Sequence, residues 1–104
     1  MHHSSALTTS ALALGAILSL LLVTCSVSSP EGKKAAHRER GLAYYQKGKF
    51  YEALIEFQNV VQLDPKDPDG HYRLALTNLQ LGGLSHLQSA FDELSKTTRL
   101  DPTN

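Results

Sequence analysis

Apolar side chains recur every three or four positions in the middle of the chain, the spacing that places them on one face of an α-helix. Between residues 50 and 63 the apolar positions are Ala53, Leu54, Phe57, Val60, Val61 and Leu63. Asp64-Pro65 ends this helix, because a residue before proline is disfavoured in the helical conformation. An earlier helix is expected over residues 35–47 and ends at Gly48, which caps a helix at little conformational cost. The pattern therefore predicts a pair of helices joined by a short turn.

A second pair of helices follows with the same features. A helix over residues 69–81 ends at Gly82, and Ala90 precedes Pro102 by 12 residues, just as Ala53 precedes Pro65. Three more residues separate Gly82 from Ala90 than separate Gly48 from Ala53. Either a loop within residues 83–88 absorbs them, or the last helix begins a turn earlier, near Leu84. We expect the longer helix, with these residues buried: Leu87, Phe91, Leu94 and Leu100.

Small, large and turn-forming residues are spaced regularly through the first pair. In order they are Gly41, Tyr44, Gly48, Ala53, Phe57 and Pro65. This spacing resembles the tetratricopeptide repeat (TPR), a helix–turn–helix unit of about 34 residues. Corresponding positions in a looser second copy are Ala75, Ala90 and Pro102. The resemblance implies an all-α fold of antiparallel helix hairpins stacked as a solenoid, and a role in binding rather than catalysis.

The resemblance also implies a division of the chain and a binding surface. Residues 35–68 would form the first repeat and residues 69–104 a second, irregular one with a longer second helix. The first helices of the two repeats would line a concave groove for a protein or peptide partner. Its residues would be Arg38, Leu42, Tyr45, Tyr72, Leu76 and Leu79. Alternatively, the three leucines of this set pack against a neighbouring repeat.

The first thirty residues contain no Asp, Glu, Lys or Arg, whereas all ten acidic and all ten basic side chains lie in residues 31–104. The apolar run over residues 11–23 is shorter than the ~20 residues of a membrane span and is typical of a secretory signal. We therefore expect residues 1–25 to be a signal peptide or membrane-anchor helix and residues 26–34 a polar linker.

The end of the apolar run carries a second resemblance. Leu22-Val23-Thr24-Cys25 resembles a bacterial lipoprotein signal, which implies acylation of Cys25. An uncleaved anchor, or ordinary cleavage near Val27–Ser29, are the alternatives. The lipoprotein interpretation predicts a membrane-anchored protein on the periplasmic side of a bacterial cell envelope.

Composition and charge argue against several other functions. Formal charges balance to zero and no stretch is strongly basic, so nucleic-acid binding has no electrostatic support. His37, His71 and His86 are too dispersed for a local metal motif and are expected to pack within the repeats. Glu52 and Glu56 are one helical turn apart and are expected on a solvated face. No nucleophile and base are paired, so we expect neither an enzyme nor a bound cofactor.

The signal and the repeats together resemble the N-terminal part of the TPR lipoproteins of exosortase/PEP-CTERM systems. That resemblance implies a scaffold that acts alongside exopolysaccharide production and protein sorting. Alternatives are a pilotin-like or outer-membrane assembly lipoprotein, and the docking module of a larger enzyme. Two repeats leave an apolar face uncovered where about three are usually needed for stability. We therefore expect either a truncated reading frame or self-association through the exposed end of the second repeat.

Overall fold

The computed structural model describes residues 29–103, which form four helices. These are α2 (Pro30–Gln46), α3 (Phe50–Leu63), α4 (Pro68–Leu81) and α5 (Gly83–Leu100). The predicted all-α class is confirmed for this part of the chain. No helix within it is both long and apolar enough to span a membrane. The predictions of a signal or anchor helix and of lipidation at Cys25 concern residues outside the described ones.

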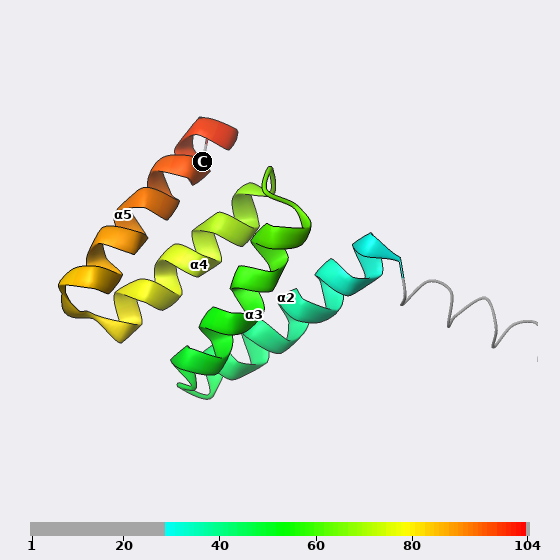
Figure 1. Cartoon of the computed structure of the whole chain (residues 1–104), viewed down its shortest axis with the longest axis horizontal. Helices are drawn as coiled ribbons and strands as arrows, with labels where there is room; N and C mark the ends of the chain where they lie inside the picture. The colour runs from blue at the N-terminus through cyan, green and yellow to red at the C-terminus, as the bar shows by residue number, and fades with distance from the viewer. Residues whose placement is uncertain (1–28, 104) are drawn as a thin grey trace, which may run out of the picture.

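The helices pack as two consecutive hairpins, as predicted. In Figure 1, α2 and α3 form one antiparallel pair and α4 and α5 the other. Packing of α3 against α4 joins the two pairs, so each helix lies mainly against its neighbours in sequence. In such an arrangement, no described helix covers the outer face at either end of the stack. Apolar side chains on these end faces are therefore exposed.

The helix ends follow from glycine and capping chemistry. Gly48, with φ 73°, closes the turn between α2 and α3 in the left-handed conformation that glycine adopts readily. Gly82 and Gly83, with φ 71° and 81°, make the next tight turn, and α5 begins at once. The three additional residues are therefore helical, which confirms the longer last helix.

The beginning of α2 differs from the prediction. The helix starts at Pro30, so the second half of the expected linker at residues 26–34 is helical. Ser29 caps it by accepting a hydrogen bond from the backbone N–H of Gly32 at 3.0 Å. Proline at the first helical position sacrifices no hydrogen bond, because that N–H has no partner within a helix. Local capping thus outweighs the turn-like composition of the segment.

The core lies where the helices cross most closely. Its buried residues are Ala53, Phe57, Val60 and Leu74. Gly41 of α2 is buried against Phe57, and Gly70 of α4 is buried against Val60 and Val61. Ala75 and Ala90 are also fully buried, in the second hairpin. Small residues therefore stand at the crossings and larger apolar ones between them.

The expected burial of the apolar residues of α5 is wrong for most of them. Leu87, Phe91 and Leu100 are 49%, 71% and 39% exposed, and Leu94 is half-buried. Leu63, expected on the inward side of α3, is 41% exposed. Helix α4 covers one face of α3, but no described helix covers the corresponding face of α5. Helical periodicity identifies an apolar face without showing what lies against it.

Candidate protein-binding surfaces

Three of the six predicted groove residues lie together and are half-buried. Leu42, Tyr45 and Leu76 surround a cavity of about 20 Å³ with Phe57 and Arg73. A space of this size holds at most one water molecule. These side chains therefore pack between α2, α3 and α4, which favours the packing alternative for the two leucines.

The other three groove residues differ in their surroundings. The guanidinium of Arg38 contacts the carboxylates of Asp67 and Asp69, with Nε of Arg38 3.2 Å from Asp69 Oδ2. Tyr72 and Leu79 are 39% and 44% exposed on α4. All six residues are half-buried or exposed, and partner binding through them stays a prediction.

Arg38 belongs instead to an ion-pair cluster that fixes the α3–α4 connection. Lys34 of α2 donates a hydrogen bond to Asp64 Oδ2 at 2.9 Å, and its ammonium lies 3.8 Å from Asp67 Oδ2. The hydrogen bond to Asp64 is the main reason that the pKa of Lys34 lies above its ordinary value. The same bond holds the pKa of Asp64 below its ordinary value. Two cations of α2 therefore hold the acidic loop from which α4 begins.

Each hairpin contains a histidine–glutamate pair that sequence reasoning missed. His37 Nδ1 lies 2.6 Å from Glu56 Oε2, and His71 Nδ1 lies 2.5 Å from Glu93 Oε2. His71 is buried, and its Nε2 lies 2.6 Å from the carbonyl oxygen of Pro65. Because a carbonyl oxygen only accepts, His71 Nε2 is the donor in its hydrogen bond to Pro65. Within the described residues, no three His, Cys, Asp or Glu side chains are grouped to hold a metal ion.

The first of these pairs corrects the expectation that Glu56 is on a solvated face. Its side chain is only 15% exposed, and it also accepts a hydrogen bond from Arg40 Nε at 3.2 Å. Partial burial acts to raise the pKa of Glu56, but the hydrogen bonds from His37 and Arg40 outweigh it, so the pKa is lowered. A sequence signal existed: the two pairs span 19 and 22 residues, and the difference equals the three-residue extension of α5.

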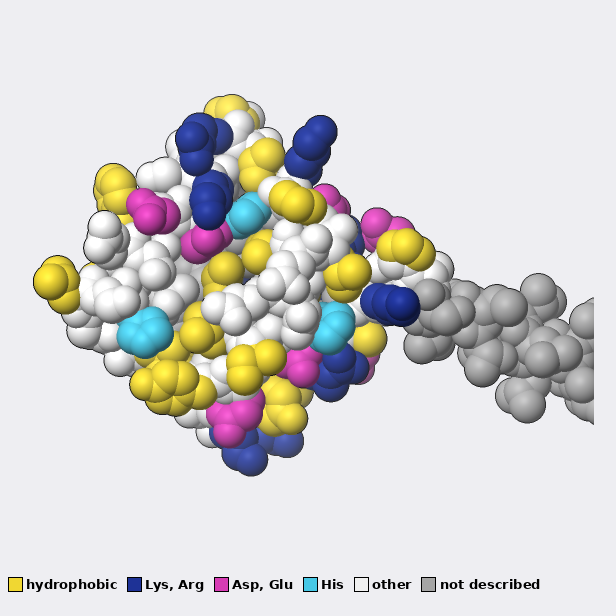
Figure 2. Space-filling view, in the orientation of Figure 1, with side chains coloured by type: hydrophobic (Ala, Val, Ile, Leu, Met, Phe, Trp, Pro, Cys, Tyr) yellow, Lys and Arg dark blue, Asp and Glu magenta, His cyan; other side chains and the backbone are white. Residues whose placement is uncertain are grey.

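A different surface carries exposed apolar side chains at regular helical spacing. We call it the α5 stripe, and it consists of Leu84, Leu87, Phe91 and Leu94. Leu84 is 85% exposed, Leu87 49% and Phe91 71%, and Leu94 is half-buried. Figure 2, in the orientation of Figure 1, shows hydrophobic side chains protruding along the α5 edge of the molecule. Exposed large apolar residues in a row mark a contact surface more often than an ordinary solvated one.

The sequences of the two hairpins can be aligned to find which residues of α3 correspond to the α5 stripe. Ala53 and Ala90 are 37 residues apart, as are Pro65 and Pro102. The same shift places Phe91 at the position of Leu54, and Leu94 at that of Phe57. Leu54 packs against the core cluster that includes Leu74 of α4, whereas Phe57 is buried against Gly41 of α2, within its own hairpin. Phe91 of the α5 stripe is therefore equivalent to a residue that, one hairpin earlier, packs against the core between the hairpins.

Comparison with known proteins agrees with this geometry. Residues 41–82 match the sequence model of a protein family described as TPR repeat. That segment runs from the middle of α2 through α3 to the end of α4. Searches of the curated proteins and of the solved structures found no significant match. TPR repeats generally bind protein partners. The chain therefore carries TPR sequence at residues 41–82, within four helices whose paired hairpins are consistent with that repeat.

Proposed function

We propose that this chain is an exported, membrane-tethered scaffold that binds another protein and catalyses no reaction. One observation carries the binding proposal: Phe91 in the α5 stripe is 71% exposed, whereas Leu54, its equivalent on α3, packs against the core cluster that includes Leu74 of α4. The TPR match at residues 41–82 supports the same class of function.

The covered surface of α3 indicates what kind of partner fits. A Cβ placed on Gly70 of α4 would lie 2.9 Å from a Val60 methyl and 3.2 Å from a Val61 methyl, so α4 approaches α3 closely. Leu74, one turn later on α4, enters the core beside this contact. By analogy, the partner is an amphipathic helix with a small residue at its crossing point and an aliphatic residue one turn away. It would cross α5 near Thr97 and Thr98, the equivalents of Val60 and Val61.

Export and tethering are supported by sequence features alone. The uncharged first thirty residues and the lipoprotein-like Leu22–Cys25 segment favour a protein attached to the periplasmic side of the envelope. The finer proposal, a role in exosortase/PEP-CTERM sorting and exopolysaccharide production, is supported by resemblance alone. Mass spectrometry of membrane-extracted protein tests the attachment: a diacylglyceryl group on a processed Cys25 is expected, and an intact Met1 contradicts it.

Site-specific photo-crosslinking in the bacterium that encodes the chain tests the binding proposal. A benzophenone amino acid replaces Phe91 in the α5 stripe. In a matched control it replaces Ile55, which is 58% exposed on α3. We expect a discrete crosslinked protein from position 91 and none from position 55. If the chain is expressed and folded but neither position gives a crosslinked product, the proposal is contradicted.

The identity of the crosslinked protein separates the remaining alternatives. A polysaccharide-synthesis or sorting component supports the PEP-CTERM role, whereas a secretin or outer-membrane assembly protein supports the pilotin-like role. A second copy of this chain indicates self-association through α5.

A further inference from the structure

A pocket of about 370 Å³ lies between the end of α5 and the start of α4. The residues that line it are Pro65, His71, Lys96, Arg99 and Leu100. Pro65, Leu100 and the His71 ring supply hydrocarbon surface, and the two basic residues add positive charge. None of the five belongs to the α5 stripe or to the predicted groove, so this pocket is a separate feature. Figure 2 shows basic, histidine and hydrophobic side chains meeting in the upper part of the molecule, over α4 and α5.

Arg99 is the cation in this pocket whose charge is uncompensated. Within the described residues it makes no hydrogen bond or ion pair, whereas the other arginines each contact a carboxylate: Arg38, Arg40 and Arg73. Lys96 donates to Glu93 Oε1 at 2.9 Å and keeps two further N–H donors. A guanidinium beside apolar walls is only weakly hydrated and is well suited to a planar anion.

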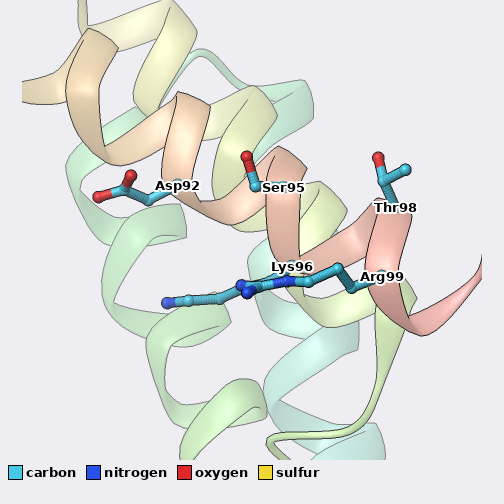
Figure 3. A pocket seen from close by; sticks show the side chains of 5 residues that line it. All are labelled: Asp92, Ser95, Lys96, Thr98 and Arg99. Atoms are coloured by element: carbon cyan, nitrogen blue, oxygen red, sulfur yellow. The ribbon is translucent and has the colours of Figure 1, made fainter.

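The charges around the pocket limit the charge of its ligand. Glu93 is already satisfied by His71 on one oxygen and Lys96 on the other. Figure 3 shows Lys96 and Arg99 extending to the same side of α5, and Asp92 lines a neighbouring hollow that these two basic residues share. With one uncompensated cation and a carboxylate nearby, a single negative charge is favoured over a double one.

We propose that this pocket binds a carboxylate of the partner protein, from an aspartate or glutamate flanked by an aliphatic residue. The Arg99 guanidinium holds the two carboxylate oxygens through parallel N–H···O bonds, and Lys96 adds a third donor. Pro65 and Leu100 contact the neighbouring aliphatic side chain. This inference rests on the proposed function and deepens it by naming the partner's chemistry.

The test measures discrimination between two labelled peptides by fluorescence anisotropy, with the full chain in non-ionic detergent. The probes are fluorescein-labelled Ala-Leu-Glu-Leu-Ala and its twin with glutamine at the central position. We expect the glutamate peptide to bind at least about tenfold more tightly. Arg99→Gln removes that difference. Lys66→Gln, at an exposed lysine outside the pocket, leaves it unchanged.

Three results would overturn the proposal. The first is equal affinity for the two peptides, and the second is full discrimination by Arg99→Gln. The second result, accompanied by a lower melting temperature, would mean that Arg99 only stabilises the C-terminus of α5. The third is displacement of the peptide by inorganic phosphate at lower concentration than by acetate, which would indicate a phosphate site. Phe91→Glu disrupts the α5 stripe but leaves peptide binding unchanged, so failure here is distinguishable from failure of the proposed function.

Discussion

Gly41 of α2 lies directly against the ring of Phe57 in α3. A Cβ placed on Gly41 would stand 2.7 Å from Phe57 Cε1 and 2.9 Å from Cζ. Phe57 is only 1% exposed, so its ring has no open space into which it could move. The close approach of α2 to α3 in the first hairpin therefore depends on the absence of a side chain at residue 41.

Gly41→Ala is expected to lower the free energy of unfolding by about 1–2 kcal/mol. Overpacking costs ~1–3 kcal/mol, and the higher helix propensity of alanine offsets up to ~1 kcal/mol of it. Urea unfolding of the full chain in detergent measures the change. In a Phe57→Leu background the same substitution is expected to be neutral or stabilising, because the clashing ring atoms are gone. Equal effects in the two backgrounds would show that the contact with Phe57 is not the cause of the destabilisation by Gly41→Ala.

The two histidine–glutamate pairs are expected to differ in their contribution to stability. His71→Ala leaves Glu93 and the Pro65 carbonyl without a buried partner and should cost about 3 kcal/mol. His37→Ala should cost about 1 kcal/mol, because Arg40 still holds Glu56. Denaturant titration of the two variants gives the comparison. A cost at residue 37 equal to that at residue 71 would contradict it.

Stability is expected to fall at acidic pH through Asp64. Its pKa in the folded chain is below the ordinary 3.8, so its contribution is present above pH 3.8 and is lost as the pH falls through the lowered value. Asp64→Asn should therefore be less stable at pH 7 and should show a flatter decline in stability as the pH falls below 3.8. Unfolding followed by circular dichroism at a series of pH values measures this.

Stability is also expected to fall at alkaline pH, through Lys34, the ion-pair partner of Asp64. The pKa of Lys34 is raised above 10.5, so its contribution is complete below pH 10.5 and disappears as the pH rises through the raised value. Lys34→Met should remove this alkaline decline and also weaken the acidic one, since both depend on the same hydrogen bond. A Lys34→Met curve parallel to wild type at both ends would contradict the assignment.

Leu54 and Phe91 occupy equivalent positions, but their substitution is expected to have different effects. Leu54→Ala removes packing against the core cluster and should cost about 2 kcal/mol. Phe91→Ala removes a side chain that is 71% exposed and should change the unfolding free energy by less than ~0.5 kcal/mol. Both values come from denaturant unfolding at low protein concentration. A large cost for Phe91→Ala would mean that another molecule covers the α5 stripe under those conditions.

Much of the local structure could be predicted from particular residues. Phe50 to Leu63 carries both a clear apolar period and the Asp64-Pro65 terminator, and α3 has these bounds. The shared 12-residue distance from alanine to proline located three additional residues before Ala90, and the longer last helix, preferred over a loop, is confirmed. Local signals failed at Pro30, because the Ser29 cap depends on one hydrogen bond that composition does not reveal. Lipidation of Cys25 and the export of the chain remain predictions.

The candidate surfaces depended on contacts between distant residues. Sequence spacing placed Glu56 on a solvated face, but the approach of α2 brings His37 and Arg40 onto it. It also predicted that Phe91 is buried, and the structure leaves this residue exposed. Helix positions, helix ends and apolar faces depend on near neighbours along the chain, so the amino-acid sequence is enough to predict them. Which of those faces is covered depends on whether another helix packs there, and that is visible only in the folded chain.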